Sequence, residues 1–157
     1  MGPNLTLYFE DRLTMQYQVQ EMLRVERIFE ADAIAEELES YNPLIPDGTN
    51  LKATMMLEYP DVEERRGALE KLRGIEDVVY VEVAELGRVF AYADEDLERS
   101  DESKTSAVHF LRFELDETMR VALKRGASLR IGVEHPVYEH ELAASASLAR
   151  ALAADLS

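Results

Sequence analysis

The stretch DVVYVEVAELGRVFAYA, residues 77–93, decides the fold class of this 157-residue chain. Two runs rich in Val, Tyr and Phe, residues 77–84 and 88–93, are separated by Glu85, Leu86 and Gly87. A glycine between two such runs supplies the backbone freedom that a tight turn needs. The stretch therefore predicts a β-hairpin, and its antiparallel pairing disfavours a purely parallel, doubly wound sheet.

On both sides of this hairpin, helical and strand periodicities alternate along the chain. The other predicted strands are residues 4–9, 51–59, 107–115 and 127–135, and the predicted helices are residues 12–29, 31–41, 62–73, 116–125 and 140–156. This order predicts an α+β fold, with a mixed, largely antiparallel sheet of about five to six strands and helices packed against it. A parallel β-α-β unit around residues 116–125 stays open. Because no linker divides residues 1–157, we expect a single domain.

Composition narrows the classes of function. The chain has 32 acidic and 17 basic residues, a formal net charge of −15, and no cysteine. A field of that sign repels phosphate backbones and anionic lipid surfaces, so we expect no nucleic-acid partner and no membrane partner. The missing cysteine excludes thiol catalysis, disulfides and cysteine-ligated zinc or iron–sulfur clusters. Because neither a secretory signal nor a membrane-spanning run is visible, we expect a cytoplasmic protein.

Two of the three histidines lie in one short segment, EHPVYEHE, residues 134–141. Imidazole and carboxylate groups suit a divalent metal such as zinc or iron. The candidate metal ligands are His109, His135, His140, Glu134 and Glu139. His109 and His135 each continue the apolar row of a predicted strand, so they can share a metal only if both lie at the same end of the sheet. The alternative is structural: histidines hydrogen-bonded at core edges, and glutamates that form an acidic helix start.

Two polar segments and the absence of catalytic motifs also bear on the function. Residues 94–106 are acidic and poor in apolar side chains, which predicts a mobile surface segment that does not pack. Residues 42–50 combine two prolines with an Asp-Gly turn, which predicts a stiff loop: a structural turn or, with Tyr59, part of a small-molecule sensor. The chain has no glycine-rich nucleotide loop and no Gly-x-Ser-x-Gly elbow, so no catalytic motif points to an enzyme.

Four stretches carry a family resemblance. They are TMQYQVQEMLR (residues 14–24), YNPLIPDGTNLKAT (41–54), KTSAVHFLRF (104–113) and HPVY (135–138). With them, nearly the whole chain resembles a bacterial domain-of-unknown-function family. The resemblance implies genes for rubrerythrin-like proteins and iron–sulfur oxidoreductases of the heterodisulfide-reductase type as neighbours, and therefore a role in redox or peroxide defence. It also implies a basic, helical N-terminal segment that the given sequence lacks.

The leading hypothesis is a non-enzymatic accessory or binding protein associated with a redox or oxidative-stress system. Its expected partner is a rubrerythrin-like protein or an iron–sulfur oxidoreductase, as the resemblance implies. The alternative is a metalloprotein or metal-dependent enzyme that uses the histidines and glutamates above. The sequence leaves the oligomeric state open, a homo-oligomer included.

Overall fold

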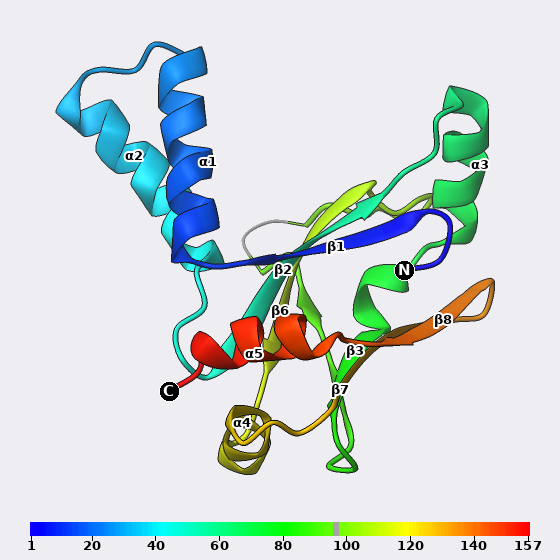
Figure 1. Ribbon diagram of the computed structural model, residues 1–157. Helices are drawn as coiled ribbons and strands as arrows, with labels where there is room; N and C mark the ends of the chain where they lie inside the picture. Colours follow the sequence, from blue (N-terminus) through cyan, green and yellow to red (C-terminus); the bar gives the residue numbers. More distant parts are fainter. Residues whose placement is uncertain (96–97) are drawn as a thin grey trace.

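The computed structural model describes residues 1–95 and 98–157 (Figure 1). Its helices are α1 (Arg12–Val25), α2 (Ala31–Tyr41), α3 (Val62–Lys71), α4 (Glu117–Lys124) and α5 (Ala146–Ala154), with short 3-10 helices η1 (Asn42–Leu44) and η2 (Ile75–Asp77). Its strands are β1 (Leu5–Glu10), β2 (Asn50–Leu57), β3 (Val79–Val83), β4 (Arg88–Phe90), β5 (Tyr92–Ala93), β6 (Val108–Glu114), β7 (Leu129–His135) and β8 (Tyr138–Ala143). The predicted α+β class is confirmed. None of the helices in the described part is long and apolar enough to cross a membrane.

The strands form two four-stranded antiparallel sheets instead of one larger sheet. Sheet A has the order β1-β2-β6-β5 and sheet B the order β4-β3-β7-β8. The hairpin predicted from residues 77–93 is present as β3 and β4, with Val81 opposite Val89. After Ala91 the chain leaves sheet B and pairs with β6 as β5, so this stretch joins the two sheets. Because β6 and β7 lie in different sheets, α4 does not form a parallel β-α-β unit.

The core lies between the inner faces of the two sheets. Along β2 the odd-numbered side chains are buried as predicted, Met55 completely, and Phe113 of β6 and Val133 of β7 are buried as well. Helices α4 and α5 contact one another and add apolar side chains such as Leu123 to the same cluster. Alternation in the strands therefore leaves the even positions of sheet A on its outer face.

Helices α1 and α2 form a hairpin that stands away from the sheets (Figure 1). Asp11 starts α1 with a capping box, in which its carboxylate accepts from the Thr14 N–H and its own N–H donates to the Thr14 hydroxyl. Helix α1 buries two side chains, Met15 and Val19, and α2 buries none. The hairpin thus covers little of the core and keeps most of its surface exposed.

Two predicted helices are shorter in the structure. Helix α1 ends at Val25, not Phe29, because Arg27 adopts a left-handed φ of 53° and the Ile28 N–H donates back to the Leu23 carbonyl at 3.0 Å. The predicted helix 140–156 is wrong over its first part. Residues 138–143 form edge strand β8, and α5 begins only after the Ser145 cap.

The prediction that residues 94–106 do not pack is wrong for part of this segment; residues 101–104 are exposed as predicted, and Asp96 and Leu97 lie outside the described residues. The Thr105 side chain is 1% exposed, and the Asp94 carboxylate is buried beside β6. Ser100 donates a hydrogen bond to Glu76 at 2.6 Å. Polar side chains here are buried because they satisfy one another.

Candidate functional site

His109 lies at the centre of a buried polar network and has no exposed surface. Its Nδ1 is 2.5 Å from an Asp94 oxygen, and its Nε2 is 2.9 Å from the Ser106 carbonyl and 2.8 Å from the Thr105 hydroxyl. The Thr105 hydroxyl donates onward to Glu76 at 2.8 Å. Burial alone would raise the pKa of Glu76, but hydrogen bonds from Ser100 and Thr105 bring it below the usual value.

Both ring nitrogens of His109 are engaged within the protein. Nε2 faces the Ser106 carbonyl and the Thr105 hydroxyl, and Nδ1 faces Asp94, which also accepts from the Phe110 N–H and pairs with Arg99. The ring therefore ties Asp94, Thr105 and Ser106 to the core, and neither of its nitrogens is left for a metal.

His135 is likewise engaged within the protein. Its Nε2 is 2.9 Å from the Arg73 carbonyl, and its Nδ1 accepts from the Val137 N–H at 3.2 Å. Both His135 and His109 lie beside the segment that leads from α3 into η2, since His109 Nε2 is 3.9 Å from Glu76. They belong to different sheets, and each ring is already hydrogen-bonded on both nitrogens. This is the arrangement of histidines hydrogen-bonded at core edges.

The remaining candidate ligands lie on opposite faces of the β7–β8 hairpin. Glu134 is paired with Glu139 across the strands, on the outer face, whereas His140 is paired with Val133 on the other face. Glu134 forms an ion pair with Arg88, and the His140 ring packs on Tyr138 with centroids 4.8 Å apart. The structure does not bring the five candidates together. Within residues 1–95 and 98–157, no group of three or more His, Asp or Glu side chains could hold a metal ion.

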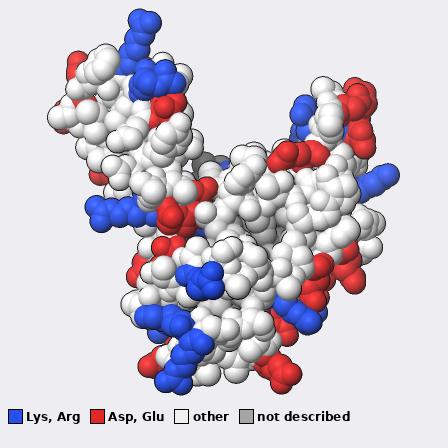
Figure 2. Space-filling model, in the orientation of Figure 1, with Lys and Arg blue, Asp and Glu red and all other residues white. Residues whose placement is uncertain are grey.

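A cavity of about 1150 Å³ borders edge strand β1 and is large enough to take a ligand. Part of its lining lies on the outer face of sheet A and part on the α1–α2 hairpin above this face; these two parts together are here called the outer groove. Figure 2 shows this side of the molecule as a hollow between the hairpin and α3, with a floor made largely of uncharged side chains. The outer groove is lined by Tyr8, Glu10, Thr14, Tyr17, Tyr41, Thr54, Met56 and Phe110.

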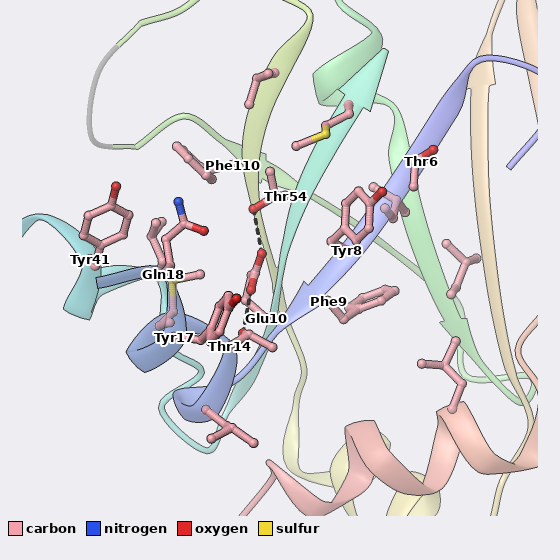
Figure 3. A pocket seen from close by; sticks show the side chains of 18 of the residues that line it. Thr6, Tyr8, Phe9, Glu10, Thr14, Tyr17, Gln18, Tyr41, Thr54 and Phe110 are labelled. Atoms are coloured by element: carbon pink, nitrogen blue, oxygen red, sulfur yellow. Dashed lines mark hydrogen bonds between the residues drawn. The ribbon is translucent and has the colours of Figure 1, made fainter. Parts of the chain in front are cut away.

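Among the residues that the structure describes, one carboxylate, that of Glu10, lies in the outer groove (Figure 3). One of its oxygens accepts from the Thr14 hydroxyl of α1 at 2.6 Å, and the other accepts from the Thr54 hydroxyl of β2 at 3.0 Å. Two elements thus fix the carboxylate in place, while each oxygen keeps a further acceptor site. The basic side chains of the same sheet are used elsewhere: Arg112 pairs with Glu95 and Glu114, and Lys52 donates to the Pro43 carbonyl.

Aromatic side chains surround this carboxylate. Tyr17 is 64% exposed and Tyr8 is 50% exposed, so both rings keep much of their surface open to contact. Figure 3 shows Tyr8 of β1, Tyr17 of α1, Tyr41 of α2 and Phe110 of β6 around Glu10. In the described part of the chain, no Lys or Arg forms an ion pair with Glu10. The outer groove therefore combines an apolar, aromatic lining with an unneutralised anion.

The outer groove was not predicted from the sequence. Its residues are dispersed between positions 8 and 110, and the stiff loop predicted from residues 42–50 contributes only Leu44 to the cavity, without Tyr59. One signal was available: the outward positions of three strands carry Tyr8, Met56 and Phe110, where an exposed sheet face would carry polar residues.

Comparison with known proteins gives a family without an assigned activity. A family model described as "Protein of unknown function (DUF3501)" matches residues 1–156. A crystal structure of a novel protein of unknown function from Burkholderia pseudomallei K96243 is 51% identical, with a TM-score of 0.95 over all of this chain and 82% of that chain. No curated protein matches. The match over almost every residue, together with the shared fold, shows that the chain belongs to the DUF3501 family.

Proposed function

We propose that this chain is a binding protein and not a catalyst, and that the outer groove binds an amphipathic segment of a partner protein that presents a basic side chain. The observation that carries the proposal is the uncovered aromatic groove with Glu10 on its floor. Recognition sites are commonly concave and mostly apolar, with a few fixed polar groups that set orientation. A partner's Lys or Arg would reach the free acceptor sites of Glu10 while its apolar neighbours pack on the tyrosines.

The family resemblance supplies the class of partner. We propose a cytoplasmic rubrerythrin-like protein or iron–sulfur oxidoreductase, which places this chain as an accessory in a redox or oxidative-stress system. The absence of cysteine favours an accessory role, because the chain has no thiol with which to take part in electron transfer or disulfide exchange. The net charge of −15 favours a partner whose contacting segment is basic.

Calorimetric titration of the partner into the full chain tests this proposal. Tyr17→Ala removes an exposed aromatic anchor, and such anchors at the centre of an interface contribute about 2 kcal/mol or more, equivalent to a roughly 30-fold weaker Kd. Glu10→Gln should weaken binding as well, because it leaves the partner's cation without its counter-charge. Tyr92→Ala is the matched control, since Tyr92 is 56% exposed on the same sheet but does not line the groove.

We therefore expect the wild type and Tyr92→Ala to bind the partner with equal affinity, and Tyr17→Ala and Glu10→Gln to bind it more weakly. Equal binding by all four proteins would refute the groove as the binding site. Failure of every candidate redox partner to bind the wild-type chain would refute the choice of partner class.

A further inference from the structure

The far end of the α1–α2 hairpin carries an exposed apolar and basic group. This arm tip comprises residues 24–29, in which Val25 is 63% exposed and Phe29 is 82% exposed. Arg27 lies between them in the left-handed backbone region that favours glycine. A glycine would end α1 at a lower conformational cost, so helix termination does not explain the arginine. Of the two arginines in the tip, Arg24 pairs with Glu21, and Glu26 is also part of the tip. The tip thus presents the apolar side chains of Val25 and Phe29 beside the Arg27 cation.

The whole molecule exposes more surface than a compact monomer of its mass. A folded monomer of 17.8 kDa exposes about 8,000 Å² by the usual scaling with mass. This chain exposes 9435 Å². The excess of about 1,400 Å² exceeds the roughly 800 Å² that each partner contributes to an interface of standard size. The projecting hairpin (Figure 1) and the hollow below it (Figure 2) contribute to this surface.

The arm tip and the outer groove are chemically complementary. The tip is apolar with a cation, and the groove is apolar with the unneutralised anion Glu10. The tip cannot enter the groove of its own chain. Leu13 and Tyr17 of α1 line the cavity, and Val25 lies about 18 Å beyond Leu13 and about 12 Å beyond Tyr17 along the same helix, at about 1.5 Å per residue. The contact must therefore form between two chains.

We propose that two copies of this chain associate about a twofold axis, with the arm tip of each copy in the outer groove of the other. Such an interface is reciprocal, because every tip–groove contact occurs twice. Resting on the proposed function, this arrangement also regulates it. The second copy occupies the same groove that receives the partner, so dimer formation and partner binding are mutually exclusive. The partner's segment must then carry the same chemistry as the tip, an aromatic or aliphatic side chain beside a cation.

Sedimentation of the full chain over a concentration series tests the association. We expect a species of twice the 17.8 kDa chain mass at high concentration. In Arg27→Glu, the new carboxylate of the tip faces Glu10 of the groove, and in Glu10→Lys, the new ammonium group of the groove faces Arg27 of the tip. Because like charges then meet at each contact, each variant alone should dimerise at least about tenfold more weakly. In an equimolar mixture, the acidic tip of one variant meets the basic groove of the other, while the unaltered tip meets the unaltered groove. Dimer should therefore return only in the mixture.

Misfolding of a variant cannot produce that pattern, because a misfolded chain would not regain dimer on mixing. Leu38→Ala is the control within the hairpin, since Leu38 is 41% exposed but lies outside both tip and groove. A wild-type chain that stays monomeric at its highest soluble concentration, or a mixture that stays monomeric, would overturn the association.

The partner titration separates this inference from the proposed function. Under both, Arg27→Glu retains partner binding and Glu10→Gln weakens it. If the chain is monomeric while Glu10→Gln still weakens partner binding, the proposed function stands and the self-association fails. If the dimer forms as described but the partner binds equally well to wild type and Glu10→Gln, the association stands and the proposed function fails.

Discussion

Gly132 of β7 is needed for space and not for backbone conformation, which makes Gly132→Ala a sharp test of the outer face of sheet B. Its φ is not among the positive values that favour glycine. A β-carbon placed there would lie 2.2 Å from Cζ and 2.3 Å from the hydroxyl oxygen of Tyr80. The Tyr80 ring lies across this glycine and is 3% exposed. It is held by a hydrogen bond from its hydroxyl to Glu141 at 2.6 Å and by the Arg88 guanidinium 4.2 Å above the ring.

The expected loss in the free energy of unfolding follows from the contacts that the Tyr80 ring loses when it is displaced. Displacing a packed side chain to admit one methyl group costs about 1–3 kcal/mol. A hydrogen bond to a charged acceptor such as Glu141 contributes about 1.5–3 kcal/mol, and the displaced Tyr80 hydroxyl loses it. Replacing glycine by alanine in a strand returns about 0.5–1 kcal/mol through the reduced entropy of the unfolded chain. We therefore expect Gly132→Ala to lower the free energy of unfolding by about 2–4 kcal/mol.

Urea unfolding followed by far-ultraviolet circular dichroism measures this loss, and a double-mutant cycle identifies its cause. In a Tyr80→Ala background the obstacle is gone, so Gly132→Ala should become neutral or slightly stabilising. Gly67→Ala in α3 is the matched control, because a β-carbon there meets nothing within 4 Å, and it should stabilise by about 0.5–1 kcal/mol. The reasoning is refuted if Gly132→Ala costs the same with and without the Tyr80 ring.

Two predictions concern pH. Burial, and then the hydrogen bond to Glu141, raise the pKa of Tyr80 to about 12. The stabilisation from neutral Tyr80 is therefore complete below about pH 10 and is lost as the pH rises through about 12, and a tyrosinate absorbance titration should lose its latest step in Tyr80→Phe. The pKa of Glu76 is lowered, so its stabilisation is present above about pH 4.5 and is lost as the pH falls through the folded-state value. Thr105→Val removes one of the hydrogen bonds that lower this pKa, and it should reduce the free energy of unfolding by about 1.5–3 kcal/mol at neutral pH. In urea titrations at acid pH, where Glu76 is protonated, the difference from wild type should become smaller. An equal difference at both pH values would show that the Thr105 hydroxyl does not stabilise the Glu76 anion.

Local signals in the sequence were sufficient where neighbouring residues decide the structure. Helix α2 begins and ends as predicted, and at Tyr41 the chain passes directly into the 3-10 helix η1, which contains Pro43. The β3–β4 hairpin and the buried odd row of β2 follow from a turn glycine and from alternation. The division into two sheets could not be predicted in this way. Strand β6 pairs with β2, more than fifty residues earlier, and only packing of the whole chain selects that partner.

Two predictions were wrong because polar residues were taken to indicate the wrong local structure. Residues 94–106 are polar, and polar segments are usually exposed, yet Thr105 and Asp94 are buried because each is hydrogen-bonded within the network of His109. Residues 140–143 precede an alanine-rich helix and were predicted to be part of it, but they belong to strand β8, residues 138–143. Their own alternation, with Tyr138 and Leu142 between charged positions, is that of an edge strand, and the two-residue turn after His135 closes it against β7.

The same alternation explains why the histidine cluster failed as a guide to the site while the outer groove went unnoticed. Closeness in sequence within residues 134–141 places imidazoles and carboxylates on opposite faces of a strand pair, so local density does not become a ligand set. Outward side chains of β1, β2 and β6, in contrast, converge in space from positions far apart in the chain. A sheet that carries Tyr8, Met56 and Phe110 on the face opposite its core has two apolar faces, and the second is incompletely covered within the chain. For a chain of this charge, that uncovered face is the more informative feature, because its exposure in water has a cost that binding removes.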